Sequence, residues 1–270
     1  MEIYCEMWTS TPLSPLGFKN KSELIAFLDE KAEQYNSTEF IKTDPIQLPH
    51  RFSKKEDIEI IGFLVSTIAW GNRTSIIKNG EKLIEIMENS PFEFIQNYND
   101  SSAKDLHFVH RTFNTYDLDF FFRSLKNIYL KGGLEKAFSP HSSVFGSQGR
   151  IINFRNEFLE TLHEQRSEKH ISNPTGNSAA KRLNMFLRWM CRKDEKGVDF
   201  GIWDSIPMSE LSIPLDVHTA NVGRKLNLIA RKQNDGKTLD EIMSHLREFN
   251  SFDPSKYDFA LFGLGAFEKY

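Results

Sequence analysis

The sequence predicts an all-α fold, and three observations support this prediction. Apolar residues recur at intervals of three and four along most of the 270-residue chain, as they do on one face of an α-helix. Capping and turn-forming residues separate these segments from one another. Alternating runs of apolar and polar residues never exceed a few positions, so no β-strand of ordinary length is expected. With 39% hydrophobic residues, the chain has enough apolar side chains for a substantial core.

The individual helices follow from their local patterns. Residues 21–35 have apolar residues at helical spacing and predict an amphipathic helix. Ser53 and Glu56 stand three positions apart before the largely apolar stretch 58–68, which predicts a capping box and a central helix. Gly263-Leu264-Gly265 has no strand before it and predicts close helix packing rather than a dinucleotide-binding loop. Further helix starts are predicted at Asn72, Ser90-Pro91, Asp117, Thr238 with Glu241, and Asp253-Pro254.

Composition and charge exclude several classes of function. The formal net charge is -3, so the chain as a whole does not attract nucleic acid and any such affinity must be local. Two cysteines, Cys5 and Cys191, are too few for an iron–sulfur cluster or a four-cysteine metal site, so we expect neither cofactor nor metal. Apolar runs are too short to cross a membrane, and the first residues lack the order of a secretory signal. We therefore expect a cytoplasmic protein without a membrane partner.

The segment 173–193 runs from a turn containing Pro174 and Gly176 into a two-faced helix. One face of this helix is apolar. The other face carries basic and polar residues, namely Lys181, Asn184, Arg188 and Arg192. By itself, this pattern is more typical of an ordinary amphipathic helix with a solvent-exposed charged face than of a functional site.

Asp216 lies in a second polar cluster, within the segment 213–226. It follows an extended Pro-Leu step and precedes apolar residues at helical spacing, which favours the role of a helix N-cap. A carboxylate that is fixed by capping hydrogen bonds is also oriented for electrostatic work. The structural and the functional interpretation of Asp216 are therefore compatible.

These two segments resemble a known superfamily. The stretch Pro-Leu-Asp-Val-His-Thr-Ala-Asn-Val-Gly-Arg-Lys-Leu, residues 214–226, resembles the Val-Asp-Thr-His-x-x-Arg-Val-x-x-Arg block of endonuclease III and the Pro-Val-Asp-Val-His of oxidised-guanine glycosylases. Residues 181–187 resemble the Lys-Thr-Ala-Asn-Val-Val-Leu that begins the second helix of the family's hairpin. Weaker similarities at 63–72 and 259–266 extend the match to most of the chain. The chain thus resembles the helix-hairpin-helix DNA glycosylase superfamily, and within it an uncharacterised bacterial branch.

The resemblance implies a fold and a site. It implies one glycosylase-like unit over 1–270, with a central helical subdomain at about 56–165 and a cleft between the two subdomains. The second subdomain, 1–55 with 166–270, carries the hairpin-like motif. By the match, Lys181 takes the place of the nucleophile and Asp216 that of the catalytic aspartate. Damaged double-stranded DNA is the implied partner, contacted by Asn72, Arg73, Gly176, Asn177, Arg182, Arg188, Arg192 and His218.

Two departures from the family pattern keep alternatives open. Four residues, 177–180, separate Gly176 from Lys181, so the turn that grips a phosphate is altered. Lys181 and Asp216 lie 35 positions apart (216 minus 181), and their meeting in space is an assumption. The implied function is a base-excision glycosylase with lyase chemistry through a Schiff base. The alternatives are a monofunctional glycosylase in which Asp216 activates water, and a nucleic-acid or ligand-binding protein that keeps the fold without the chemistry.

Overall fold

The computed structural model describes residues 18–139 and 146–270, and over these residues the all-α prediction is confirmed. The α-helices are α1 (Lys21–Tyr35), α2 (Thr38–Ile41), α3 (Lys55–Thr67), α4 (Arg73–Ile86), α5 (Pro91–Asn97), α6 (Asp100–Lys104), α7 (Thr115–Leu130), α8 (Leu134–Ala137), α9 (Ser147–Phe158), α10 (Lys181–Cys191), α11 (Val217–Lys225), α12 (Gly236–Phe249) and α13 (Tyr257–Ala266). Short 3-10 helices connect them: η2 (Pro45–Gln47), η3 (Pro49–Arg51), η4 (Gln165–His170), η5 (Pro174–Gly176), η6 (Met208–Glu210) and η7 (Pro254–Lys256). In the described part, β-structure is limited to a small antiparallel hairpin of β1 (Val109–His110) and β2 (Phe113–Asn114).

The predicted helix starts are partly correct. Asn72 caps α4 as predicted, because its side chain accepts a hydrogen bond from the Ser75 N–H. The capping box predicted from Ser53 and Glu56 is wrong: Lys54 occupies the N-cap of α3 and makes no side-chain cap. Nearly every residue of α3 after its first turn is buried, so tertiary packing holds this helix where local capping does not.

The N-caps of α7 and α12 lie three residues before the predicted ones, and the reason is the same in both helices. Asn114 caps α7 and Asp117 is the third residue of the resulting capping box, not the cap itself. Asp235 caps α12, and Thr238 again stands at the third helical position. In both cases a residue with a short polar side chain lies three positions before the predicted cap and takes the capping role.

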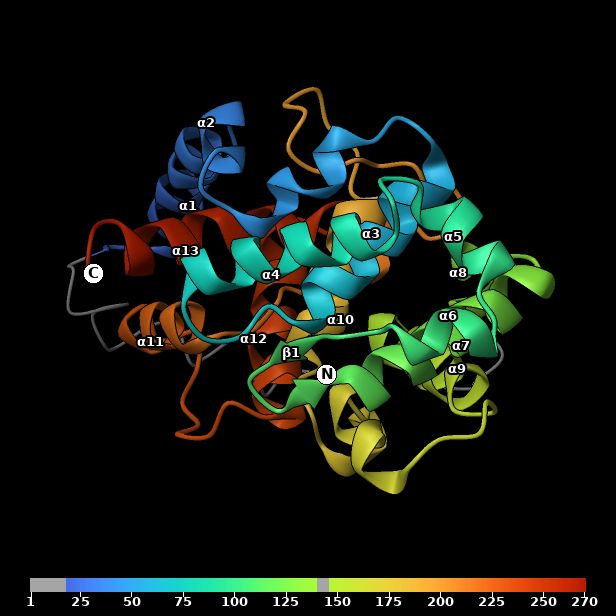
Figure 1. The fold of residues 1–270 in the computed structure, drawn as a ribbon. Coiled ribbons are helices and arrows are strands. Elements are labelled where there is room, and N and C mark those ends of the chain that lie inside the picture. The colour runs from blue at the N-terminus through green and yellow to red at the C-terminus, as the bar shows by residue number, and fades with distance from the viewer. Residues whose placement is uncertain (1–17, 140–145) are drawn as a thin grey trace.

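The helices enclose two apolar cores rather than one. The larger core joins α3, α4, α5, α7, α8, α9 and α10, and the smaller core joins α1, α11, α12 and α13. In Figure 1 the elements of the smaller core lie on the left, those of α5 to α9 lie on the right, and α3, α4 and α10 run between them. Much of the segment 166–211 packs into the larger core, together with helices of the predicted central subdomain.

Aromatic contacts explain why the segment after α10 joins the larger core. The Phe186 ring of α10 lies 5.7 Å from Phe63 of α3 and 5.4 Å from Trp203, in the chain between α10 and α11. The Trp203 indole N–H also donates a 2.6 Å hydrogen bond to the buried carboxylate of Glu59. The long connection between α10 and α11 is therefore part of the larger core, and the path of the chain through this core sets the position at which α11 begins.

Two glycines bring α13 close to its neighbours, as predicted for this segment. A Cβ atom on Gly263 would collide with the Tyr35 ring of α1, and one on Gly265 would lie 2.9 Å from the Cβ atom of His218 in α11. Only a residue without a side chain permits this approach. The N-terminal end of α11 is therefore held against α13.

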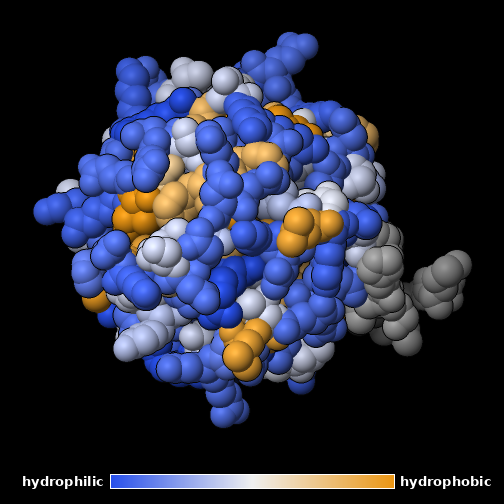
Figure 2. Space-filling view, turned by 45° about the vertical axis from the view of Figure 1, so that its right-hand side comes forward, coloured by the Kyte–Doolittle hydropathy of each residue, from blue (hydrophilic) through white to orange (hydrophobic). Residues whose placement is uncertain are grey.

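The face of the molecule in Figure 2 is mostly polar. Figure 2 shows one face of the molecule, where hydrophobic residues form a few small patches among hydrophilic ones. Of the helices in residues 18–139 and 146–270, none combines the length and the apolarity needed to cross a bilayer.

Candidate active site

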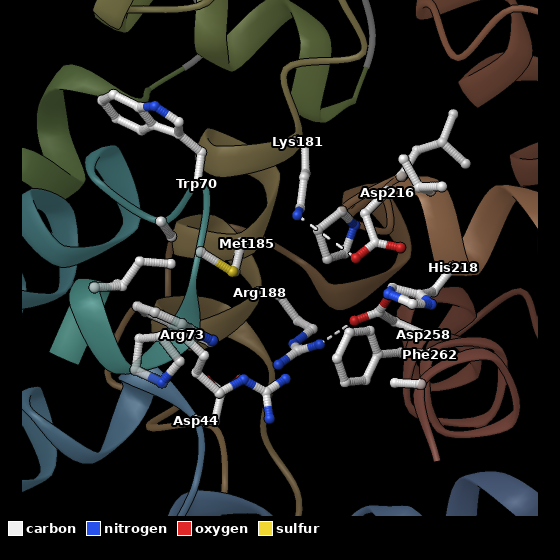
Figure 3. Close-up of a pocket in the computed structure, with 18 of the residues that line it drawn as sticks. Asp44, Trp70, Arg73, Lys181, Met185, Arg188, Asp216, His218, Asp258 and Phe262 are labelled. Atoms are coloured by element: carbon white, nitrogen blue, oxygen red, sulfur yellow. Dashed lines mark hydrogen bonds and ion pairs between the residues drawn. The ribbon is translucent and has the colours of Figure 1, made fainter. Parts of the chain in front are cut away.

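A pocket of about 590 Å³ lies where the two cores meet (Figure 3). Its walls come mainly from the segment before η2, the start of α4, α10, the start of α11, and α13. Trp70, Met185 and Phe262 are among the many apolar residues of the lining, and charged side chains of both signs lie between them. A pocket of this size and mixed lining is suited to a small molecule or to a single extruded nucleotide base.

Lys181 and Asp216 lie next to each other in this pocket. The Lys181 Nζ atom is 3.5 Å from the Asp216 Oδ2 atom, and the dashed line in Figure 3 marks this pair. The Lys181 side chain is 39% exposed and the Asp216 side chain 12% exposed, so the amine is reachable from the pocket. Folding thus brings together two residues that are separated by a long connection in the sequence.

Each of the two residues is positioned by a helix start. Asp216 is the N-cap of α11, and its Oδ1 atom accepts a 2.8 Å hydrogen bond from the Thr219 N–H. This fixes one carboxylate oxygen and leaves the other turned toward Lys181. Lys181 is the first residue of α10, directly after Ala180, whose φ of +45° lies in the left-handed region. A non-glycine residue in that region carries backbone strain, which is frequent next to functional groups.

The hairpin-like turn before α10 is anchored to another helix. Asn177 donates from its side-chain amide to Asp235 (3.0 Å), and its side-chain oxygen accepts from the Lys237 N–H (3.1 Å). Asn177 therefore connects the turn to the N-terminus of α12. Gly176 is exposed and lines a second cavity of about 470 Å³ beside the turn.

Two of the predicted phosphate ligands are corrected by the structure. Arg188 and Arg192 are each only 3% exposed, so they do not form a solvent-facing basic surface. Arg188 pairs with Asp199 at 3.2 Å and with Asp258, and Arg192 pairs with Asp253 at 2.9 Å. The acids come from segments that close over α10, and this is why the face predicted to be basic lies inside the protein.

The remaining predicted contacts lie near the pocket rim. Asn72 and His218 are exposed, and the Arg73 guanidinium lies 5.7 Å from the Phe262 ring centroid. Arg182 covers the Trp70 ring at 4.7 Å and donates to the backbone oxygen of Thr67. Burial lowers the pKa of Arg182 to about 10. Arg182 therefore packs against Trp70 of the pocket lining, and its guanidinium group is already engaged by the Trp70 ring and the Thr67 oxygen.

Asp258 is a member of the site that the sequence did not indicate. It is the second residue of α13, is buried, and lines the pocket beside Arg188 (Figure 3). Burial raises the pKa of Asp258 to about 7, against the opposing effect of Arg188, and the charges of Asp216 and Asp199 raise it further. An acid in the first turn of an apolar helix is a common feature, so the sequence contained no signal for this role.

Asp44 is a second buried acid in the pocket wall that the sequence did not indicate. Its carboxylate accepts a 3.0 Å hydrogen bond from the Ile46 N–H and caps η2. Burial raises the pKa of Asp44, and the charges of Arg73 and Arg188 oppose this effect. Among the described residues, no three side chains of the His, Cys, Asp or Glu type are grouped as they would be around a metal ion.

The fold and the site define an all-α protein with two cores and a lysine–aspartate pair in the pocket between them. By sequence, the chain belongs to a family described as proteins of unknown function, DUF2400, whose model matches residues 44–267. The match includes the pocket lining apart from Phe40. No curated protein and no solved structure matches the chain.

Proposed function

We propose that this protein is a base-excision DNA glycosylase with a lyase step that proceeds through a Schiff base. One observation carries the proposal: the Lys181 amine and the Asp216 carboxylate lie 3.5 Å apart in a pocket of about 590 Å³. The resemblance of the surrounding segments to the helix-hairpin-helix glycosylases assigns the same two residues to the nucleophile and the aspartate. Geometry and resemblance therefore point to the same pair.

The chemistry follows from the properties of the two groups. The target nucleotide turns out of the duplex so that its base enters the pocket. The Lys181 ammonium first gives up a proton to solvent, and the neutral amine then attacks the sugar carbon C1′ while the bond from C1′ to the base breaks. Positive charge develops on the sugar as the base departs, and the Asp216 carboxylate stabilises it electrostatically. The covalent product rearranges to a Schiff base, from which strand cleavage follows.

The cavity beside the hairpin turn supports a nucleic-acid partner. Arg155, Lys169 and Arg182 line it together with the backbone of Gly176. Arg155 is paired with Glu168 at 2.6 Å, whereas Lys169 is exposed. Because Arg182 is likewise engaged by protein groups, the exposed Lys169 amine is the group in this cavity that we expect to neutralise a backbone phosphate, even though the whole chain is acidic.

Borohydride trapping tests the proposal. Wild-type protein is mixed with duplexes that contain an abasic site and is reduced with borohydride, which converts a Schiff base into a stable adduct. We expect a covalent protein–DNA band for the wild type and none for Lys181→Gln, because the amide nitrogen is not a nucleophile. Lys193→Gln is the matched control, since Lys193 pairs with Asp204 on the surface outside the pocket. An equal adduct in Lys181→Gln would contradict the proposal.

The position of Asp216 favours a second candidate, a monofunctional glycosylase in which this carboxylate activates water. Its orientation is fixed by the capping hydrogen bond and does not depend on Lys181. In that case Asp216→Asn abolishes base release, whereas Lys181→Gln retains it. Neither the wild type nor Lys181→Gln then forms a covalent adduct. Binding of abasic-site DNA without base release or adduct would instead support the non-catalytic alternative.

A further inference from the structure

The pocket contains two neighbouring carboxyl groups whose surroundings differ. Asp216 accepts a hydrogen bond from the Thr219 N–H and lies 3.5 Å from the Lys181 amine, and both contacts suit a negatively charged group. Asp258 is more deeply buried. One of its oxygens, Oδ2, accepts from Arg188, while Oδ1 is enclosed and has no hydrogen-bond partner among the described residues. A buried polar atom without a partner is rare and calls for an explanation.

In Figure 3 the Asp258 carboxylate lies below Asp216, between Arg188 and the Phe262 ring, and further from Lys181 than Asp216 is. Lys181 and Asp216 must face the sugar carbon if the proposed function is correct. The same pocket also contains Asp258, so a base that enters it with the sugar carbon beside Lys181 and Asp216 is in reach of a third side chain.

From this geometry we infer that Asp258 is a further catalytic residue, a general acid that protonates the departing base. The inference rests on the proposed function. The Lys181 lone pair forms a bond to C1′, the electron pair of the C1′–base bond passes to the base, and the base takes the carboxyl proton of Asp258. The Asp258 carboxylate that results is stabilised by Arg188, and the Lys181 nitrogen releases one proton to solvent.

The charged groups around Asp258 agree with this role. Arg188 and Lys181 belong to α10, Asp199 to the connection after it, and Asp216 to the start of α11. Burial dominates over the two cations and, with the two acids, raises the pKa of Asp258 to about 7. The group therefore holds a proton in a large fraction of molecules near neutral pH. Two carboxyls with such different surroundings commonly divide the roles of charge stabiliser and acid.

The experiment compares two reactions that differ only in the departing base. Duplexes carrying uracil, hypoxanthine or 8-oxoguanine report base release, and a duplex with a preformed abasic site reports Schiff-base trapping. We expect Asp258→Asn to slow base release about 100-fold while trapping stays within a few-fold of wild type, because an abasic site has no base to protonate. Wild-type base release should decline as the pH rises through 7, and this decline should be absent from the residual activity of Asp258→Asn.

Asp199→Asn is the control for structural damage. Asp199 shares Arg188 with Asp258 but does not line the pocket. This variant should keep the decline in base release with rising pH and move it to lower pH, because the Asp199 charge raises the pKa of Asp258.

The possible outcomes separate the inference from the proposed function. Equal losses of base release and trapping in Asp258→Asn would overturn the inference and leave the proposed function intact. Wild-type protein that traps abasic sites but releases none of the three bases would also overturn it, since there is then no departing base. A wild-type protein that forms no adduct contradicts the lyase step of the proposed function. If that protein still releases a base, and the release depends on Asp258, the result supports Asp258 as the general acid.

Discussion

The two ends of α10 carry the same kind of side chain in different surroundings. At its first residue, the Lys181 amine is 39% exposed and meets one carboxylate at 3.5 Å. At its other end, the Arg188 and Arg192 guanidinium groups are each 3% exposed and together meet Asp199, Asp253 and Asp258. The first end is thus open to a ligand, whereas the second is closed by the protein's own acids.

A basic helix face is therefore not by itself a binding surface. Helical spacing places Lys181, Arg188 and Arg192 on one face of the helix, but it does not indicate what covers them. The cover comes from the connection after α10 and from the start of α13. A charge becomes available to a ligand only where such a cover is absent, as at Lys181.

Removing Arg188 should produce the largest change in stability. Arg188→Met leaves Asp199 and Asp258 buried without their main cation, which should lower the free energy of unfolding by about 3–5 kcal/mol. Urea denaturation followed by circular dichroism measures this loss. A triple variant that also contains Asp199→Asn and Asp258→Asn should recover much of it, because the unpaired charges are gone. A loss below about 1 kcal/mol in the single variant would show that the two ends of α10 do not differ in this way.

A smaller effect, of at most about 2.8 kcal/mol between pH 5 and 7, should appear in the pH dependence of stability. The pKa of Asp258 is about 7 in the folded protein and near 3.8 in the unfolded chain, so the folded state binds the proton more tightly. The contribution of Asp258 to stability is therefore complete below pH 3.8 and is lost as the pH rises to 7, by at most about 1.4 kcal/mol per pH unit.

Urea denaturation of wild type and Asp258→Asn at several pH values between 5 and 8 checks this dependence. As the pH rises to 7, the wild type should lose unfolding free energy relative to Asp258→Asn. Above pH 7 the difference between the two proteins should stay constant. A difference that is constant with pH would mean that Asp258 ionises as an ordinary surface acid does.

The fold could be predicted from the sequence because periodicity and capping are local. The bounds of α1 and the cap at Asn72 follow from side chains within one helical turn. The division into two cores could not be predicted in the same way, since it depends on contacts such as Phe63 with Phe186, which lie far apart in the chain. The central position of α3 was predictable from its apolar residues, although its cap was not.

The site could be predicted only where its residues lie in motifs. Lys181 and Asp216 each begin a helix within a recognisable segment, and the structure places their side chains together. Asp44 and Asp258 have no motif, and their relevance arises from burial and from the neighbouring arginines. Arg188 and Arg192 look available to phosphate in the sequence. The acids that pair with them lie in other segments, so the local pattern does not show that both arginines are buried in ion pairs.

The smallest effect on stability is expected at the open end of α10. Lys181→Gln should change the free energy of unfolding by less than about 1 kcal/mol, because a partly exposed pair at 3.5 Å is screened by solvent. Asp216 also keeps its hydrogen bond from the Thr219 N–H and is not left without a partner. The same urea measurement used for Arg188→Met provides the direct comparison. A loss of about 3 kcal/mol in Lys181→Gln would mean that this pair is as structural as the buried network, and an amine so firmly held would be a poor nucleophile.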